Sequence, residues 1–207
     1  MSKTGKLKHM KNSTEDYIER IFENASKLTA VRVDLSYTKE HANQCSLKDL
    51  NQDLSHLQSL RRSNKTVFRD MVGFVIKREY TEDKGPHAHA LFLFNGQKVQ
   101  KDAYKGDQLG ELWQDVTDNK GIYYNCNRNK ENYARSGLGL IDHTDTEKRE
   151  SLNLAVDYLC KSEQSIDPLK ETGKERSFTR GVAPRPKSNA GRPRHEIEGE
   201  APETDEN

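Results

Sequence analysis

Two histidines stand two residues apart in GPHAHALFLF, the stretch at residues 85–94. If this stretch is a strand, successive side chains alternate faces, so His87 and His89 share one face with Leu91 and Leu93. The two imidazoles then lie roughly 6.5 Å apart along the strand, which lets both converge on one metal ion. An H-x-H pair alone is weak evidence for a metal site, because most such pairs are hydrogen-bonded or exposed histidines.

A carboxylate that could complete the site precedes the histidines. GFVIKREY at residues 73–80 is followed by the turn-rich TEDKGP, and this order predicts an antiparallel hairpin with the histidine strand. Glu79, eight residues before His87, would lean over the face of the imidazoles and give a His, His, Glu site with open positions for substrate. Glu82 is the competing carboxylate, but it falls in the turn and is expected to point to water. The ligands alone would suit zinc as well as a harder ion.

A tyrosine and a lysine stand near the end of the last predicted helix. With about 100° of rotation per residue, Tyr158 falls roughly 60° outside the apolar stripe, where a side chain can reach a sheet surface and still meet solvent. Lys161, three residues on, lies on the same side. Beside a cation site this pair suggests phosphoryl transfer with tyrosine as the nucleophile, whereas alone it suits a snorkelling tyrosine and an unrelated surface lysine. The stripe consists of Leu152, Ala155, Val156 and Leu159.

Helical and strand periodicities alternate along the rest of the chain. Helices are expected over residues 14–28, from Ser46 to about Arg62, around Leu109–Val116, and after a capping box at Thr144–Glu147. VRVDLSY at residues 31–37 alternates apolar and polar side chains like a strand with one buried face, and weaker strands are expected at 121–125 and 136–142. Mixed helices and strands around a hairpin predict an α+β fold, an antiparallel β-sheet flanked by helices.

Composition and charge divide the chain into three parts. Hydrophobic and charged residues each make up 32% of the 207 residues, so one domain with segments outside its core is expected. Residues 1–13 are predicted to be a basic, flexible N-terminus and residues 14–168 the domain. Residues 169–207 are predicted to be a disordered tail, basic and then acidic. The basic character outside the acidic tip suits a polyanion such as DNA or a merely solvated surface.

Several classes of protein are disfavoured. No apolar run could span a bilayer or serve as a signal peptide, so a cytoplasmic location without membrane association is expected. Cys45, Cys126 and Cys160 form no CxxC pair, so neither a disulfide framework nor a cysteine zinc site is indicated. The G-x-x-x-x-G-K-[ST] loop of an ATP site is missing from the sequence.

Three segments carry a resemblance to a known superfamily. VRVDLSY, REYTEDKGPHAHALF and AVDYLCK resemble, in order and spacing, the three motifs of the HUH endonucleases that initiate rolling-circle replication. The chain is most similar to the YagK/YfjJ group of cryptic prophage proteins, which resemble the replication initiators of filamentous phages. The resemblance spans about residues 30–165, and the third motif is specific only in company with the second.

The resemblance implies a strand-specific DNA nicking and joining enzyme with an HUH/RRM-like Rep nuclease fold. Glu79, His87 and His89 would hold Mg²⁺ or Mn²⁺, Tyr158 would form a 5′-phosphotyrosine link, and Lys161 would steady the phosphate. The implied partners are single-stranded or melted DNA, with a host helicase and polymerase. The sequence does not predict an oligomeric state.

The chain departs from the superfamily pattern at two points. Ala88 stands between the histidines, where a bulky apolar residue is usual, which would loosen the packing of that strand on its opposite face. Tyr158 has no second tyrosine within one turn, so each subunit would use a single nucleophile.

Further basic residues could contact DNA. Arg192 and Arg194, in AGRPRH, resemble the core of an AT-hook that enters a narrow minor groove, although a basic linker is the plainer interpretation. Arg32 could contact DNA or pair with Asp34 on the same strand face. The alternative to an enzyme is a non-catalytic prophage DNA-binding regulator that keeps the initiator fold. RNA binding is less favoured, because the sequence contains no aromatic motif of the RRM kind.

Overall fold

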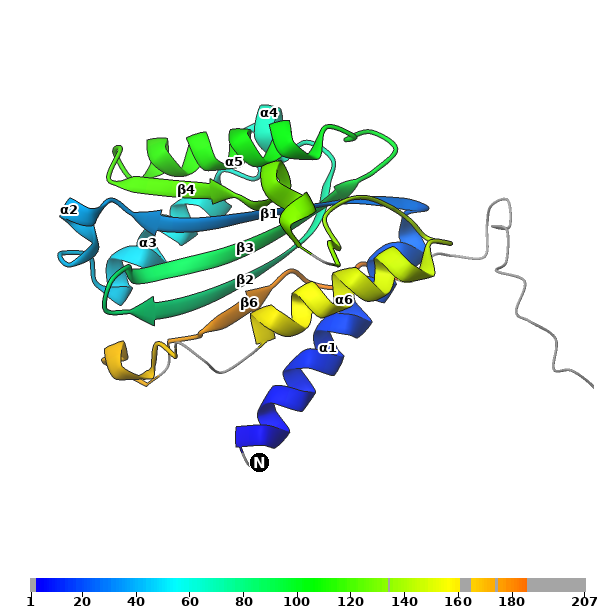
Figure 1. The fold of residues 1–207 in the computed structure, drawn as a ribbon. Helices are drawn as coiled ribbons and strands as arrows, with labels where there is room; N and C mark the ends of the chain where they lie inside the picture. Colours follow the sequence, from blue (N-terminus) through cyan, green and yellow to red (C-terminus); the bar gives the residue numbers. More distant parts are fainter. Residues whose placement is uncertain (1–2, 134, 161–164, 174, 186–207) are drawn as a thin grey trace, which may run out of the picture.

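The fold is a six-stranded antiparallel sheet with helices on both faces, which confirms the predicted α+β class (Figure 1). The computed structural model describes residues 3–133, 135–160, 165–173 and 175–185. The strand order is β4-β1-β3-β2-β6, and β5 also pairs with β1. The strands are β1 (Lys27–Tyr37), β2 (Met71–Thr81), β3 (Gly85–Asn95), β4 (Gly121–Asn125), β5 (Gly139–Asp142) and β6 (Phe178–Arg180).

Long helices cover the sheet and short ones connect its strands. In Figure 1, α6 lies in front of the sheet and α1 packs against α6 and extends below the sheet, while α3 lies behind it. No helix among the residues described is long and apolar enough to cross a membrane. The helices are α1 (Lys3–Asn24), α2 (Lys39–Ala42), α3 (Leu47–Ser59), α4 (Lys65–Phe68), α5 (Asp102–Val116) and α6 (Thr146–Cys160), with 3₁₀ turns η1 (Cys126–Asn132) and η2 (Asp167–Leu169).

The predicted hairpin of residues 73–94 is present as β2 and β3. Their antiparallel register places Glu79 opposite His87 and Lys77 opposite His89. Gly85 follows the turn with φ +64°, and a Cβ there would lie 2.3 Å from the backbone oxygen of Ala42. A side chain at this position would therefore disturb both the turn and its packing.

The alternation of the histidine strand separates two cores on opposite faces of the sheet. Ala88, Ala90, Phe92 and Phe94 pack with α3, α4 and α5 in one core. Leu91 and Leu93 pack in the other core with α1 and α6. Because His87 and His89 share the face of these leucines, they lie on the α1/α6 side, as the alternation predicts.

The second predicted helix begins where its capping box indicates. The Ser46 hydroxyl accepts a hydrogen bond from the backbone N–H of Asp49, and the Asp49 carboxylate accepts one from the backbone N–H of Ser46. This reciprocal pair satisfies two backbone donors that the first helical turn leaves open. Behind the cap, Leu47, Leu50, Leu54 and Leu57 are buried.

Helix α1 runs from Lys3 to Asn24. This corrects both the flexible N-terminus predicted for residues 1–13 and the helix predicted for residues 14–28. The early turns of α1 are tied to the domain. Lys11 pairs with Asp157 of α6 at 2.5 Å, and the Thr14 hydroxyl donates to the Met10 carbonyl inside the helix. The Ser13 hydroxyl accepts a hydrogen bond from Arg180 of β6. Long-range contacts thus extend a helix that local sequence signals start too late.

The predicted disordered tail of residues 169–207 also begins too early. Residues 178–180 form β6, which pairs antiparallel with Val75–Lys77 of β2. The short FTR strand is held by its neighbour rather than by its own periodicity, which explains why the pattern alone misses it. Residues 186–207, with Arg192, Arg194 and the acidic tip, lie outside the described residues.

Other predicted boundaries shift by a few residues. The cap of α6 is Asp145, whose carboxylate accepts the backbone N–H of Lys148 at 3.0 Å, rather than Thr144. The helix predicted around Leu109 begins earlier, at Asp102, and the strand predicted at 136–142 is confined to β5.

The capping box of α3 yields a stability prediction. Ser46→Ala removes the hydroxyl that accepts the Asp49 N–H, so the free energy of unfolding should fall by about 1 kcal/mol in a urea titration. The matched control is Ser55→Ala on an exposed position within the same helix, which should leave stability unchanged or slightly higher because alanine favours helix. Equal losses for both variants would contradict a capping role.

Candidate active site

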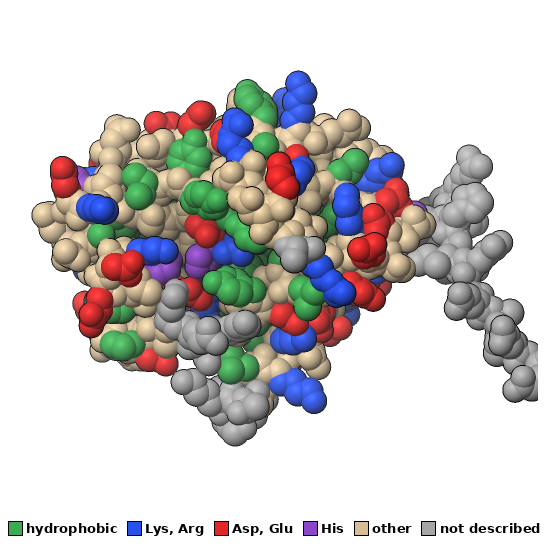
Figure 2. Space-filling view, in the orientation of Figure 1, with side chains coloured by type: hydrophobic (Ala, Val, Ile, Leu, Met, Phe, Trp, Pro, Cys, Tyr) green, Lys and Arg blue, Asp and Glu red, His purple; other side chains and the backbone are tan. Residues whose placement is uncertain are grey.

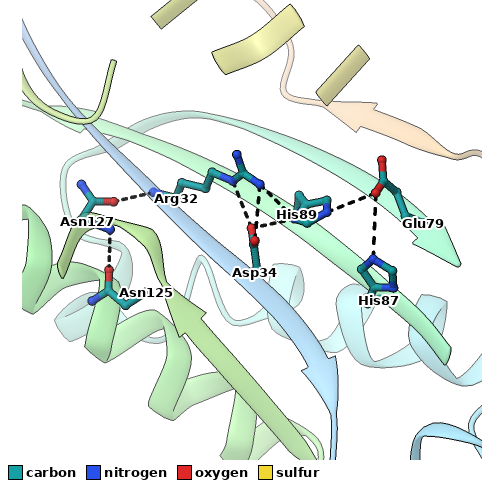
Figure 3. Close-up of polar contacts among 7 residues, drawn as sticks. All are labelled: Arg32, Asp34, Glu79, His87, His89, Asn125 and Asn127. Carbon is teal, nitrogen blue, oxygen red and sulfur yellow. Dashed lines mark hydrogen bonds and ion pairs between the residues drawn. The ribbon is translucent and has the colours of Figure 1, made fainter. Parts of the chain in front are cut away.

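Glu79 on β2 and His87 and His89 on β3 converge on one point above the sheet (Figure 3). One oxygen of Glu79 lies 3.2 Å from Nε2 of His89 and 3.9 Å from Nε2 of His87. The three candidate ligand atoms all lie within 4.8 Å of one another. The side chains are only 6%, 5% and 11% exposed, in the same order. This group could hold a metal ion, as the H-x-H pair with a preceding glutamate predicts.

The second nitrogen of each imidazole is already engaged. Nδ1 of His87 lies 2.9 Å from the carbonyl oxygen of Gly85, which can only accept, so this nitrogen carries the hydrogen. Nδ1 of His89 lies 2.7 Å from the Asp34 carboxylate and donates to it in the same way. Both rings therefore turn Nε2 toward Glu79. Metal-binding histidines are commonly fixed by this arrangement, so the donor set fits a cation.

The charges around His89 favour a positively charged species at its Nε2. Burial lowers the pKa of His87. Burial also acts to lower the pKa of His89, but the hydrogen bonds to Asp34 and Glu79 outweigh it and raise this pKa. The carboxylates of Asp34 and Glu79 are accompanied by one guanidinium, that of Arg32, within this contact network. A proton on His89 or a bound cation would add positive charge beside these two carboxylates.

Asp34 and Arg32 extend the site across β1. The Nε of Arg32 donates to Asp34 at 3.0 Å, so the predicted pairing on one strand face is present. Burial opposes the effect, yet His89 and Arg32 together hold the pKa of Asp34 below its usual value. The other predicted role of Arg32, contact with DNA, remains a proposal.

Asn127 of η1 fixes the backbone beneath Arg32. β1 pairs with β5 through Lys27–Ala30 and with β4 through Val33–Tyr37, which leaves a gap between these ladders. The Asn127 amide fills it, because its oxygen accepts the Arg32 N–H at 2.8 Å and its nitrogen donates to the Ala30 carbonyl at 2.8 Å. The Asn127 side chain thus takes the place of a neighbouring strand at Arg32, whose guanidinium belongs to the site (Figure 3).

Tyr158 of α6 lies at the edge of this group and is 47% exposed. Its ring centroid is 6.4 Å from that of His89, and the guanidinium carbon of Arg32 lies 5.2 Å from the tyrosine ring centroid. The helical rotation that sets Tyr158 outside the apolar stripe is therefore confirmed. Lys161 lies outside the described residues, whereas Glu82 is exposed in the hairpin turn, as predicted.

A pocket of about 510 Å³ joins Tyr158 to the histidines. Three residues that sequence reasoning missed also line it, namely Lys84, Tyr133 and Arg135. On this face of the molecule, histidine side chains lie beside basic, acidic and apolar ones (Figure 2). The missed residues belong to loops without periodicity, so only their place in the fold brings them to the site. The pocket thus combines cations with aromatic rings.

Gly137 sets how closely α6 approaches the sheet beside this pocket. A Cβ at residue 137 would lie 2.3 Å from both the backbone nitrogen and the Cα of Leu152. These are backbone atoms of α6 and cannot rotate away, so a larger residue would push the helix and the loop before β5 apart. Gly137 also lines the pocket, so the shape of the pocket depends on this close contact.

Comparison with protein families gives one finding for most of the chain. The family model described as the YagK/YfjJ C-terminal domain matches residues 1–181. The match ends directly after β6, which agrees with the corrected C-terminal boundary of the fold. No curated protein and no solved structure matches the chain.

The carboxylate ligand can be tested against its neighbour in the turn. Mn²⁺ at a concentration a hundredfold above its dissociation constant should stabilise the protein by about 2.7 kcal/mol in thermal denaturation. Glu79→Gln should abolish this gain, because the amide removes the charged oxygen between the imidazoles. Glu82→Gln is the matched control and should keep the gain; the opposite ranking would assign the ligand to Glu82.

The hydrogen bond from His89 to Asp34 can be tested in the same way. Asp34→Asn keeps the shape but removes the charge that orients and polarises the imidazole, so Mn²⁺ affinity should fall about 10- to 100-fold in calorimetry. Asp83→Asn, at an exposed turn position, is the control and should bind like the wild type. Unchanged affinity in Asp34→Asn would show that the carboxylate does not support the site.

Proposed function

Because this chain belongs to the YagK/YfjJ C-terminal domain family, we propose that it is a metal-dependent DNA nickase of the HUH type, active as a phage or prophage rolling-circle replication initiator. The observation that carries the proposal is the shared pocket of Tyr158, His87 and His89. A half-exposed tyrosine beside three buried candidate ligands suits phosphoryl transfer to a protein hydroxyl, because metal coordination is one way to activate such a nucleophile.

In the proposed reaction, the Tyr158 hydroxyl oxygen forms a bond to the phosphorus of the scissile phosphate. The bond from phosphorus to the 3′ oxygen breaks, which leaves a free 3′-hydroxyl and a 5′-phosphotyrosine. The proton lost by tyrosine equals the one gained by the 3′ oxygen, so the step needs no further reactant. The new ester conserves the energy of the broken bond, and attack by a 3′-hydroxyl reverses the step and joins the strand.

The side chains around Tyr158 supply the charges that this step needs. A tyrosine hydroxyl ordinarily loses its proton only near pH 10, at about its reference pKa. The Arg32 guanidinium lies beside the ring, where it can offset the negative charge of the phosphate under attack, and Asp34 holds this guanidinium in place. Glu79, His87 and His89 would hold a divalent cation, Mg²⁺ or Mn²⁺, which when bound supplies Lewis-acid polarisation of the phosphate.

The pocket suits a single strand better than a closed duplex. Tyr133 and Tyr158 present exposed rings on which unpaired bases can stack, and Lys84 and Arg135 can meet the phosphates. Arg32 is the third cation of this surface. Single-stranded or locally melted DNA is therefore the proposed substrate, with strand separation and synthesis left to host enzymes.

The nucleophile is tested by the covalent product. Labelled single-stranded DNA from the neighbourhood of the gene, incubated with protein and Mn²⁺, should give a protein–DNA adduct on a denaturing gel that EDTA prevents. Tyr158→Phe should abolish the adduct and keep DNA binding, because it removes only the attacking oxygen. Tyr133→Phe, which changes another tyrosine of the same pocket, is the matched control and should keep the adduct.

Two outcomes of this experiment would overturn the mechanism. An adduct of normal yield in Tyr158→Phe would assign the nucleophile to another residue. Tight binding without an adduct on any sequence would favour the non-catalytic regulator, in which His87 and His89 remain from an ancestral site.

A further inference from the structure

We propose that a second surface of this protein binds the phosphate backbone of double-stranded DNA. It is the basic hollow, a depression of about 720 Å³ between the end of α3 and the start of β2, lined by Arg61, Arg62, Lys65 and Arg69 among others. The inference goes beyond the proposed cleavage, but the choice of DNA over other polyanions rests on that function.

The cations of the basic hollow outnumber its acidic residues four to one. In the part of the chain that the structure describes, no carboxylate lies within ion-pair distance of Arg61, Arg62, Lys65 or Arg69. The hollow is lined by one acidic residue, Asp70, which pairs with Lys98 at 3.1 Å. Four positive charges that share a depression with one carboxylate, itself paired with a lysine, create a positive potential that attracts an anion with several charges.

Some cations elsewhere on the domain are neutralised by nearby carboxylates. Arg149 pairs with Glu19, Lys130 with Asp102 and Arg128 with Asp107. The chain has 33 acidic residues, so carboxylates are not scarce. Among the described residues, exposed cations at scattered positions such as Arg20 and Lys120 also lie beyond ion-pair distance of any carboxylate. What distinguishes the hollow is that four cations gather in one depression.

The backbone that carries these cations is fixed. The guanidinium carbon of Arg61 lies 4.7 Å from the ring centroid of Phe74, which holds this side chain over the sheet edge. The carbonyl oxygen of the Asn64 side chain accepts the backbone N–H of Val67 at 3.1 Å and caps α4. Val67 and Phe68 anchor this short helix in the core, with Lys65 and Arg69 at its two ends. The backbone positions from which these charged side chains extend are therefore fixed.

The chemistry of the hollow favours a duplex over a single strand. Its aromatic residue, Phe68, is only 5% exposed, so no ring among the lining residues is free to stack on an unpaired base. Proteins that hold single strands combine basic grooves with such rings. Contacts to phosphates alone, made by arginine and lysine, position a protein on a duplex without reading its sequence.

The basic hollow and the candidate active site lie against opposite faces of the sheet. Val67 and Phe68 of α4 belong to the core with α3 and α5, whereas Val156 and Leu159 of α6 belong to the other core (Figure 1). A duplex on the hollow therefore leaves the tyrosine pocket open. The two surfaces together suit a substrate that has a paired segment next to an unpaired one.

The test measures the association constant for a short duplex at several salt concentrations. Each phosphate contact contributes about 0.9 to the slope of log K against log salt. The variant R61Q/R62Q/K65Q/R69Q should lower the magnitude of this slope by about 3 to 4. The control R20Q/K39Q/K101Q/K120Q removes four exposed charges from scattered positions and should change the slope far less.

A smaller variant guards against misfolding. R62Q/R69Q leaves the Arg61 contact with Phe74 intact and should lower the slope by about 2. A slope equal to that of the wild type in both hollow variants would overturn the proposal. So would an equal loss of affinity for single-stranded and duplex DNA, which would assign the cations to the unpaired strand.

The covalent assay separates this proposal from the proposed cleavage. The quadruple hollow variant should form the Mn²⁺-dependent adduct on a short single strand in the same yield as the wild type. Tyr158→Phe should keep the wild-type salt slope on the duplex. A lower magnitude of the salt slope with an unchanged adduct yield supports the second surface. A fall in both quantities would show that the hollow serves the tyrosine pocket itself.

Discussion

The register between β2 and β3 is the constraint on which the candidate site depends. It sets Glu79 directly opposite His87, and alternation then brings His89 to the same carboxylate. A slip of one residue would turn both imidazoles toward the core of α3 and α5 and turn alanines toward α6. The apolar side chains of the two cores resist such a slip, so hydrophobic burial on both faces holds the ligands in place.

Buried charge is the second element of the design. Glu79, Lys77 and His87 are all buried on the face of α1 and α6, where an isolated charge would be costly. Burial lowers the pKa of Lys77, although the charge of Glu79 opposes this effect. Asp34 and Arg32 continue the alternation of sign toward solvent. The polar face is thus a connected set of opposite charges that ends at an accessible tyrosine.

Sequence reasoning recovers the parts of this arrangement that follow from periodicity. Strand alternation gives the common face of the histidines, and helical rotation gives the exposed edge position of Tyr158. The hairpin spacing selects Glu79 over Glu82, because only the former is on a paired strand. These inferences use local rules, and the structure retains them.

The remaining parts depend on contacts between distant segments, which local patterns do not encode. Asp34 orients His89 only because β1 pairs with β3, and Asn127 supports Arg32 from a turn with no regular pattern. β6 exists because β2 offers it an open edge. Strand alternation alone predicts that Asp34 lies on the face opposite to Val33. The register between β1 and β3 is needed to identify His89 as its partner on that face.

The close contact of Gly137 with α6 gives a marker for comparing related chains. A chain with glycine at the equivalent position can seat its helix against the loop, and its tyrosine then reaches the histidines as it does here. A chain with a bulkier residue can keep the same motifs in its sequence, but its loop and helix cannot pack this closely. The residue that reports the reach of the tyrosine is therefore one that carries no functional group, and motif matching alone overlooks it.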